Sequence, residues 1–325
     1  MKLKDKYNRI ADYLRIGVTD RCNLRCRYCM PEQGIDFANR KDILTYEEIV
    51  RLAEIFRELG VNKVRLTGGE PFVRKDIEIL LKSLCDIFPK VHITTNATLL
   101  TDHIPLLKSL GICGLNISID SLDRDKFLMI TRRDTFEIVM SNLLLCIESE
   151  IPIKLNVVVM KGVNDMEILD FVSFGMEHNI EVRFIEAMPF NEDDGNKDVF
   201  MPASDIFDLI KSKFSTISKI ENGPAASADL YTIDDQYRVG IIPAYSRTLC
   251  GFCNRIRITP KGELMTCLYS TQGKDLRALL RDAKVSNDDI TKEILESIHH
   301  KKKDGFEEER LQENTVFRSM TTIGG

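Results

Sequence analysis

The sequence predicts an α/β fold whose parallel strands form a partial, open barrel. Between residues 12 and 186, six short segments rich in β-branched or other apolar residues alternate with helix-like segments. Strands that alternate with helices are typical of right-handed β/α units and a parallel sheet. Six strands are too few for the usual closed eight-stranded barrel. We therefore expect a partial barrel of about six β/α units, with an open doubly wound sheet as the alternative.

Each expected strand has the length and composition of a buried strand. In chain order they are DYLRIGVT, KVRLT, VHITT, GLNISID, IKLNVVV and EVRFIE. The clearest helix lies in LTYEEIVRLAEIFRELG, residues 44–60, where Thr45 and Glu48 form a capping box and Gly60 is a stop signal. Other expected helices cover DHIPLLKSLG, a segment around residues 134–149, and NDMEILDFVSFGMEHN.

The pattern changes after residue 190, where we place a domain boundary between residues 1–190 and 191–325. NEDDGNKD reads as a loop, and one helix is expected around residues 204–213. The strand-like pieces ADLYTI, YRVGIIP and RIRITPKGELMTCLY follow, and the Pro-Lys-Gly turn in the last of them predicts a hairpin. A charged, helical tail completes this C-terminal region.

Composition limits the function classes. The 325 residues are 43% hydrophobic and carry a formal net charge of −5, so no global basic field favours a nucleic acid or an anionic membrane. A local basic pocket stays open as an alternative. We see no apolar run of the ~18–20 residues that a membrane span needs, and no signal peptide. We therefore expect a cytoplasmic protein, in which structural disulfides are rare.

Nine cysteines then indicate metal binding, catalysis or core thiols. Two sets are clustered: C-x3-C-x2-C, at Cys22, Cys26 and Cys29, and C-x2-C-x13-C, at Cys250, Cys253 and Cys267. We call them the first trio and the second trio. The other three, which lie in apolar segments, are expected to be small buried core residues: Cys85, Cys113 and Cys146.

Each trio is one ligand short of a usual metal site. Structural zinc takes four Cys or His ligands, and nothing supports His92, the histidine nearest the first trio, as the fourth. The second trio could be a zinc ribbon that lacks a ligand or uses a distant histidine. Three cysteines can instead bind three irons of a 4Fe–4S cube and leave one iron open. Because an open position marks a catalytic centre, we expect a substrate or cofactor as the fourth ligand.

Chemistry-bearing motifs follow the expected strands at their carboxyl ends. The first trio follows the first strand, TGGEP the second and TTN ends the third. Ser118 and Asp120 end the fourth strand, and Glu186 and Met188 end the sixth. In both candidate architectures the active site lies at that edge of the sheet.

The first trio resembles the motif of the radical S-adenosylmethionine enzymes. Its pattern has an aromatic residue, Tyr28, before the last cysteine, and a strand-borne GGEP motif follows at Gly68–Pro71. The resemblance implies that the methionyl amine and carboxylate of S-adenosylmethionine bind the open iron. An electron from the reduced cluster then cleaves the sulfonium and yields a 5′-deoxyadenosyl radical.

The stretch TLCGFCNRIRITPKGELMTCL, residues 248–268, resembles the C-terminal site of the GTP 3′,8-cyclases of molybdenum cofactor biosynthesis. Further matches are YLRIGVTDRCN, VRLTGGEP, NISID, KLNVVVMKG, RFIEAM, GPA and the terminal Gly324-Gly325. The resemblance implies two 4Fe–4S clusters, the second with its open iron facing the purine of GTP. The implied reaction converts GTP to (8S)-3′,8-cyclo-7,8-dihydroguanosine 5′-triphosphate, after hydrogen abstraction at the ribose C3′.

The same resemblance assigns the site residues. The positions that contact S-adenosylmethionine are Tyr28, Gly69, Ser118 and Met188. The positions that contact GTP are Arg15, Arg65, Thr94, Lys154, Arg255, Ile256 through its backbone, Arg257, Gly324 and Gly325. Arginine suits phosphate, and glycine permits close backbone approach. No side chain is assigned as a catalytic residue, because the cofactors supply the chemistry.

The implied partners are an external electron donor, a cyclic pyranopterin synthase that receives the product, and a second copy of the chain in a homodimer. The terminal glycines could instead be a frayed end or a conjugation tail. Two departures from the family pattern, Ala97 after TTN and Thr19 before Asp20, affect local turn geometry only. A peptide-modifying radical enzyme and a non-catalytic iron–sulfur or zinc module are the alternative functions.

Overall fold

The computed structural model describes residues 2–188, 199–221, 223, 226–311 and 319–323. Its centre is one sheet in the order β12-β11-β10-β1-β2-β3-β4-β5-β6-β9-β8-β7. The six central strands pair in parallel: β1 (Tyr13–Gly17), β2 (Lys63–Thr67), β3 (Lys90–Thr95), β4 (Gly114–Ser118), β5 (Ile153–Val159) and β6 (Glu181–Glu186). Since β1 to β6 lie in sequence order with no reversal, the sheet is not doubly wound.

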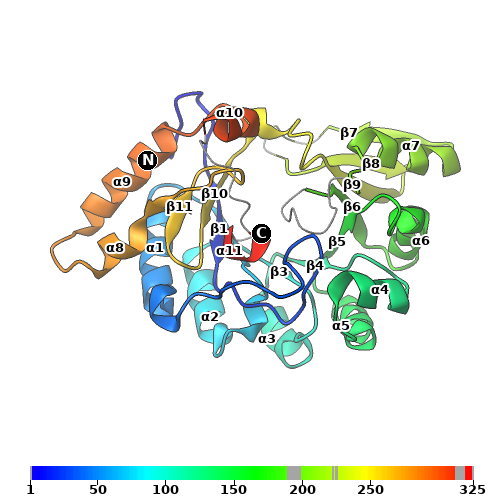
Figure 1. Ribbon diagram of the computed structural model, residues 1–325, viewed down its shortest axis with the longest axis horizontal. Coiled ribbons are helices and arrows are strands. Elements are labelled where there is room, and N and C mark those ends of the chain that lie inside the picture. Colours follow the sequence, from blue (N-terminus) through cyan, green and yellow to red (C-terminus); the bar gives the residue numbers. More distant parts are fainter. Residues whose placement is uncertain (1, 189–198, 222, 224–225, 312–318, 324–325) are drawn as a thin grey trace.

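Helices follow these strands and lie along the outer side of the curved sheet (Figure 1). They are α1 (Tyr46–Glu58), α2 (Ile77–Ile87), α3 (Ile104–Ser109), α4 (Arg124–Thr131), α5 (Phe136–Glu148) and α6 (Ile168–Glu177). The predicted helices correspond to α1, α3, α5 and α6, whereas α2 and α4 were not predicted. The buried residues of α2 have helical spacing, so periodicity did carry its signal: Ile77, Leu80, Leu81 and Leu84.

Both edges of the central sheet are extended by strands from the C-terminal part of the chain. On the β1 side these are β10 (Arg255–Ile258), β11 (Glu263–Met265) and β12 (Lys274–Asp275); on the β6 side, β9 (Tyr237–Ile242), β8 (Asp229–Ile233) and β7 (Ile217–Ile220). The predicted hairpin is confirmed, because β10 and β11 pair antiparallel across Gly262. Within the described chain the two outermost strands are β12 and β7, so the sheet is open.

The remaining helices are α7 (Ala203–Lys213), α8 (Leu276–Arg281), α9 (Asn287–His299), α10 (Gly305–Arg310) and α11 (Met320–Ile323). Short 3₁₀ turns complete the fold: η1 (Arg40–Asp42), η2 (Pro71–Val73), η3 (Thr101–His103), η4 (Asp165–Glu167) and η5 (Cys250–Phe252). The loop predicted at residues 191–198 lies outside the described residues, and the domain boundary at residue 190 stays a prediction.

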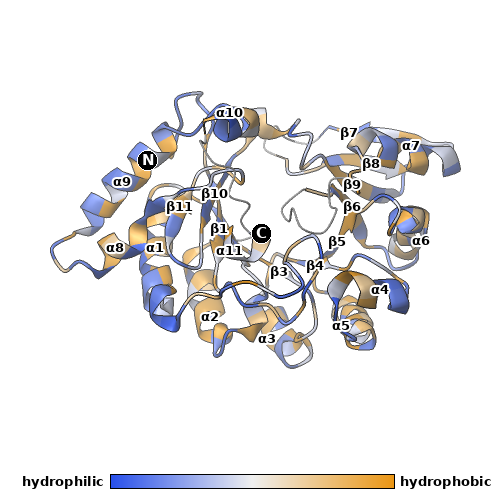
Figure 2. Ribbon diagram, in the orientation of Figure 1, coloured by the Kyte–Doolittle hydropathy of each residue, from blue (hydrophilic) through white to orange (hydrophobic). Residues whose placement is uncertain are grey.

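The strands have one apolar face and one polar face. In β5 the buried side chains of Leu155 and Val157 alternate with the half-buried Lys154 and Asn156. The apolar face packs against the helices in one continuous core, and Figure 2 shows hydrophobic residues where the helices meet the sheet. The polar face therefore points into the hollow side of the sheet, where charged groups can collect.

The three isolated cysteines do not behave alike. Cys146 is buried and Cys85 is half-buried, but Cys113 is exposed, so the prediction of a buried thiol is wrong for Cys113. It lies in the turn between α3 and β4, before the strand enters the core. Among the described helices, none is both long enough and apolar enough to span a bilayer.

The capping box at the start of α1 is confirmed, and we expect its loss to destabilise the fold. The Thr45 hydroxyl accepts from the Glu48 N–H at 3.2 Å, and the Glu48 carboxylate accepts from the Thr45 N–H at 2.7 Å. Thr45→Ala should lower the free energy of unfolding by about 1 kcal/mol in a urea titration, whereas Thr45→Ser should preserve it. Equal unfolding midpoints for both variants would contradict this role of the cap.

Candidate active site

The first trio lies in the loop that follows β1. All three side chains are partly buried, and the Cys26 carbonyl accepts from the Cys29 N–H at 2.9 Å. Burial raises the pKa of Cys22 to about 12 and that of Cys29 to about 11. These thiols are therefore protonated at neutral pH until a metal displaces the proton.

Two glycines after β2 hold this loop against the sheet. A Cβ on Gly68 would lie 2.3 Å from the Thr19 carbonyl oxygen, and one on Gly69 would lie 2.2 Å from that of Arg21. Gly68 also has a φ of +134°, which side chains disfavour. The Gly69 N–H donates to the Thr19 carbonyl at 2.8 Å. Gly69 thus serves close backbone packing here, and its predicted contact with S-adenosylmethionine stays a prediction.

The buried carboxylate of Glu70 joins the ends of β2 and β3. It accepts hydrogen bonds from the Asn96 N–H at 2.7 Å, the Thr95 hydroxyl at 2.9 Å and the Phe72 N–H at 3.1 Å. Burial raises the pKa of Glu70 to about 7, although these hydrogen bonds oppose the shift. The Asn96 amide in turn lies 3.7 Å from the Cys22 sulfur, so this network reaches the first trio.

Three further residues predicted to contact S-adenosylmethionine also lie at strand ends. The Tyr28 hydroxyl donates to Asp120 at 2.9 Å, two residues beyond Ser118, the last residue of β4. Burial raises the pKa of Asp120 to about 6, although the hydrogen bonds that it accepts from the Val158 N–H and Tyr28 act to lower it. Met188 follows β6, and its sulfur lies 3.9 Å from the Tyr269 hydroxyl.

Arginines gather on the hollow side of the sheet. Arg257 of β10, Arg15 of β1 and Arg65 of β2 are register partners on neighbouring strands. We call these three residues the arginine row. Burial, together with the charges of Arg15 and Arg255, lowers the pKa of Arg257 to about 9. Because like charges crowd at one level, the row is suited to a ligand with several negative charges.

The row continues onto β3 through Arg65. Its guanidinium donates to the Thr94 hydroxyl at 3.2 Å and to the Ile93 carbonyl at 3.1 Å, so two of the residues predicted to bind GTP are in contact. His92 pairs with Arg65 in the register, and burial together with the surrounding cations lowers its pKa to about 3. His92 is thus a neutral imidazole beside the row.

Tyr13 was not identified from the sequence, yet it contacts the row directly. Arg65 donates to its hydroxyl at 2.6 Å, and the Lys63 ammonium lies 4.3 Å from the ring centroid. Burial alone would raise the pKa of Tyr13, but the charges of Arg65, Arg15 and Lys63 outweigh burial and lower it to about 7. The alternation of Tyr13 with Arg15 and of Lys63 with Arg65 on two strands was the available signal.

The other predicted GTP contacts differ in their surroundings. Lys154 forms an ion pair with Glu181 at 2.7 Å, and Glu181 also binds Arg183 at 2.5 Å. Lys154 therefore has an anionic partner in this structure. Ile256 is fully buried in the core, so its side chain faces away from the row.

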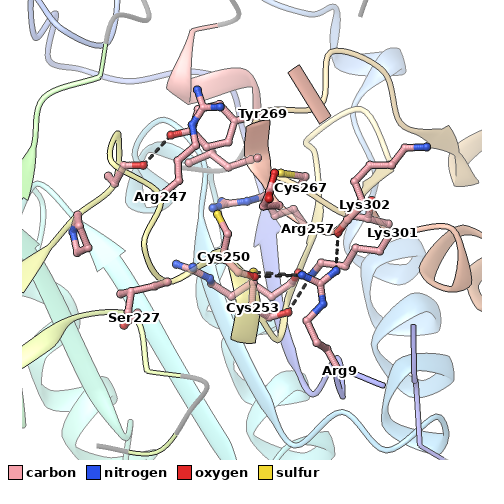
Figure 3. Close-up of a pocket in the computed structure, with 18 of the residues that line it drawn as sticks. Arg9, Ser227, Arg247, Cys250, Cys253, Arg257, Cys267, Tyr269, Lys301 and Lys302 are labelled. Carbon is pink, nitrogen blue, oxygen red and sulfur yellow. Dashed lines mark hydrogen bonds between the residues drawn. The ribbon is translucent and has the colours of Figure 1, made fainter. Parts of the chain in front are cut away.

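The second trio lines a pocket, together with arginine and lysine side chains. Cys250 begins η5, Cys253 caps it, and Cys267 follows β11; Figure 3 shows them around the pocket with Arg257. Arg255 and Arg257 alternate on β10 and project from one side of it, since both line this pocket. Burial opposes ionisation of Cys253, but the charges of Arg255 and Lys301 outweigh it and lower its pKa to about 6.

The two trios lie at opposite ends of β1. The first follows the carboxyl end of β1, whereas the Tyr13 N–H at its amino end donates to the carbonyl of Asn254, the residue after Cys253. β1 has five residues, a length of roughly 16 Å. The arginine row lies between these ends. Among the described residues, no three His, Cys, Asp or Glu side chains converge on one metal ion.

The C-terminal segment reaches the first trio. The Ser319 hydroxyl donates to the Cys29 carbonyl at 2.7 Å, and the Thr321 N–H donates to the Ser319 hydroxyl at 3.4 Å. The helix that these residues begin, α11, contacts β1. Gly324 and Gly325, which were predicted to bind GTP, lie outside the described residues.

Comparison with known proteins identifies the family. Residues 16–175 match the Radical SAM superfamily, and residues 180–307 match Molybdenum Cofactor Synthesis C. The GTP 3′,8-cyclase of Clostridium perfringens (strain 13 / Type A) is 38% identical over 330 residues, which cover 99% of this chain and 100% of that protein. The chain belongs to the GTP 3′,8-cyclase family.

Further relatives have similar sequence identity but differ in length. The mitochondrial GTP 3′,8-cyclase of Arabidopsis thaliana is 39% identical, over 99% of this chain and 83% of the relative. Molybdenum cofactor biosynthesis protein 1 of Dictyostelium discoideum is 41% identical over 93% of this chain, but the chain spans only 49% of that relative. The chain thus spans about half the length of some of the curated relatives that it matches.

Solved structures confirm the fold. Streptococcus suis SuiB bound to S-adenosylmethionine superposes with a TM-score of 0.60 over 86% of this chain and 68% of SuiB, at 16% identity. At that identity the likeness concerns the fold alone. The open α/β sheet is therefore shared with a protein of very different sequence.

One departure from the GTP 3′,8-cyclase pattern has a structural reading. Ala97, a departure noted in the sequence, adopts a φ of +63°, in the left-handed region that favours glycine. The surroundings hold it there: its carbonyl accepts from the Asn142 side chain at 2.7 Å, and its N–H donates to the Thr95 hydroxyl at 3.0 Å. The turn after TTN therefore accommodates an alanine in the left-handed conformation.

We expect Tyr13 to titrate near neutral pH. Its folded pKa of about 7 lies below the model-compound value of 10.0, so the ionised phenol stabilises the fold fully above pH 10.0 and loses that contribution as the pH falls through about 7. The ultraviolet difference spectrum between wild type and Tyr13→Phe should show one tyrosinate appearing near pH 7. Tyr7→Phe, at an exposed tyrosine, is the control. If wild type and Tyr13→Phe have the same spectrum at every pH below the range in which an ordinary tyrosine ionises, the assignment is contradicted.

Proposed function

We propose that the chain is a radical S-adenosylmethionine enzyme that converts GTP to (8S)-3′,8-cyclo-7,8-dihydroguanosine 5′-triphosphate in molybdenum cofactor biosynthesis. One observation carries the proposal: two cysteine trios lie at opposite ends of β1, and the arginine row lies between them. Membership of the GTP 3′,8-cyclase family supports the same reaction.

The first trio fits a 4Fe–4S cluster with an open iron. Its donor set is three partly buried thiols in the one loop that follows β1. Cysteines of such a cube bind different irons and need not converge on one point. When bound, this cluster and S-adenosylmethionine supply a 5′-deoxyadenosyl radical. Tyr28, Gly69, Ser118 and Met188 line the cofactor at the strand ends.

The chain's own task is to hold the nucleotide in reach of that radical and away from water. Arg15, Arg65 and Arg257 bind the triphosphate on the hollow side of the sheet, and Thr94 adds a hydroxyl. Lys154 reaches the nucleotide only by sharing or leaving Glu181, so its contribution depends on the substrate being present. The predicted contact of Gly324 and Gly325 with GTP belongs to the same proposal.

The second trio would hold the second 4Fe–4S cluster, which would offer its open iron to the guanine. The cavity residues fit this group, because Arg255, Arg257 and Lys301 surround three thiols that are anionic when they bind iron. The finer architecture belongs to the same proposal: six β/α units in a partial barrel, with residues 191–325 as the region that holds this cluster. An external electron donor, a cyclic pyranopterin synthase, a homodimer and a cytoplasmic location complete the proposal.

The two trios should be separable by mutation. Cys22→Ser should abolish S-adenosylmethionine cleavage, because the radical-generating cluster loses a ligand. Cys267→Ser should leave some reductive cleavage but form no cyclised GTP. Both are measured anaerobically as 5′-deoxyadenosine and cyclised nucleotide, with Cys113→Ser, at an exposed thiol, as the matched control. Cyclisation at the wild-type rate by the Cys267 variant would refute the role of the second trio.

The arginine row should determine the affinity for GTP. A charge-assisted hydrogen bond contributes ~1.5–3 kcal/mol, so Arg65→Ala or Arg257→Ala should weaken GTP binding roughly ten- to a hundred-fold in calorimetry. Arg124→Ala, on the outer face of α4, is the control. S-Adenosylmethionine cleavage without GTP should persist in all three variants. Unchanged GTP affinity in both row variants would exclude the row as the phosphate site.

A further inference from the structure

Lys301 is a buried lysine that touches the loop of the second trio. Its exposed fraction is 4%, and its ammonium donates to the Arg255 carbonyl at 2.9 Å and the Cys253 carbonyl at 3.0 Å. The same nitrogen lies 3.6 Å from the Cys253 sulfur. Figure 3 shows Lys301 pointing at Cys253 from the side of the pocket opposite Cys250 and Arg247.

The geometry indicates a charged side chain. Three acceptors around one nitrogen match the three N–H bonds of an ammonium group, whereas a neutral amine has only two. A lysine this deeply buried is rare unless it is paired. Its partners here are the Cys253 sulfur and the carbonyls of Cys253 and Arg255.

The segment that carries Lys301 is itself held in place. Lys301 follows α9, and its N–H donates to the Ile298 carbonyl at 3.1 Å. Arg9 binds the next two carbonyls, of Lys302 and Lys303, and donates to the Cys250 carbonyl at 3.0 Å. The Arg9 guanidinium is fixed by Asp5 at 2.6 Å in a buried ion pair. Two cations thus bind the ligand loop, one at Cys250 and one at Cys253.

We propose that Lys301 is a positioning residue that places a positive charge on the Cys253 sulfur and so determines how tightly, and at what reduction potential, the second cluster is held. The inference rests on the proposed function, because it requires that the second trio binds a 4Fe–4S cluster. Hydrogen bonds to the sulfurs and local charge are the protein's means of tuning such clusters. A cation at the ligand sulfur stabilises the reduced, more negative cluster, so it raises the potential.

The chain offers a graded set of variants. Lys301→Met removes the charge and the donors at similar volume. Lys301→Gln keeps a donor for the carbonyls but no charge, and Lys301→Arg keeps the charge. Lys303→Met, two residues along the chain with an exposed side chain, is the matched control. Each is made in the full-length chain and reconstituted anaerobically with iron and sulfide.

Three readouts separate charge from folding. Iron and sulfide per chain report cluster content, and the rate of iron transfer to a chelator reports retention. Potentiometric titration followed by electron paramagnetic resonance reports the two reduction potentials. We expect Lys301→Met to lose iron from the second site about 10- to 100-fold faster than wild type. The reduction potential of the second cluster should fall, while the first cluster is unchanged. Lys301→Arg should restore both properties, and Lys303→Met should match wild type.

The outcomes distinguish the two proposals. If wild-type protein binds about four irons instead of about eight, the second cluster is absent and the proposed function is contradicted. If wild type holds two clusters and Lys301→Met has unchanged iron release and potential, only the proposed role of Lys301 is contradicted. If Lys301→Met does not fold, Lys301→Gln decides: a wild-type potential in that variant overturns the inference, and a lowered one supports it.

Discussion

The close contact between two backbones, Gly68-Gly69 after β2 and Thr19–Arg21 after β1, is the constraint on which the candidate active site depends. No Cβ fits between them, so the loop that carries the first trio can lie flat on the strand ends. Glu70, the next residue, then binds the end of β3 and places Asn96 beside Cys22. Three strand ends and three thiols are thereby ordered by one tight turn. Loss of that contact would displace the thiols before any of them was altered.

A second constraint is electrostatic. Placing the arginine row and Lys63 on the hollow side of a sheet is costly without anions, and Tyr13 provides partial compensation. Four strands from β2, Glu181 does the same for Lys154 and Arg183. Neither of these groups lies in a recognisable motif. The net charge of −5 gives no indication of this basic interior, because acidic residues outnumber basic ones in the chain as a whole.

Much of this arrangement was readable from the sequence. Strand alternation, the capping box at Thr45 and the spacing of both trios each depend on local pattern, and the structure confirms the first two. Helix α2 was missed although its spacing was regular, whereas Tyr13 needed attention to alternation on two strands at once. Lys301 had no local signal, since KKKD reads as a solvated charge run. The contacts that hold the second trio join distant parts of the chain, and pattern within one segment cannot reveal them.

The contacts of Arg9 and Lys301 with the loop of the second trio also determine the order in which the two sites form during translation. Arg9 and Lys303 are joined by a hydrogen bond across 294 positions, and Lys301 is 48 positions beyond Cys253. A growing chain folds from its N-terminal part first, so the central sheet can form while the partner segment of Arg9 is still inside the ribosome. The first trio emerges early as one short loop. The second trio gains its contacts with Lys301 only when translation is nearly complete. A prematurely terminated chain would therefore have a folded central sheet but lack the contacts that hold the second trio.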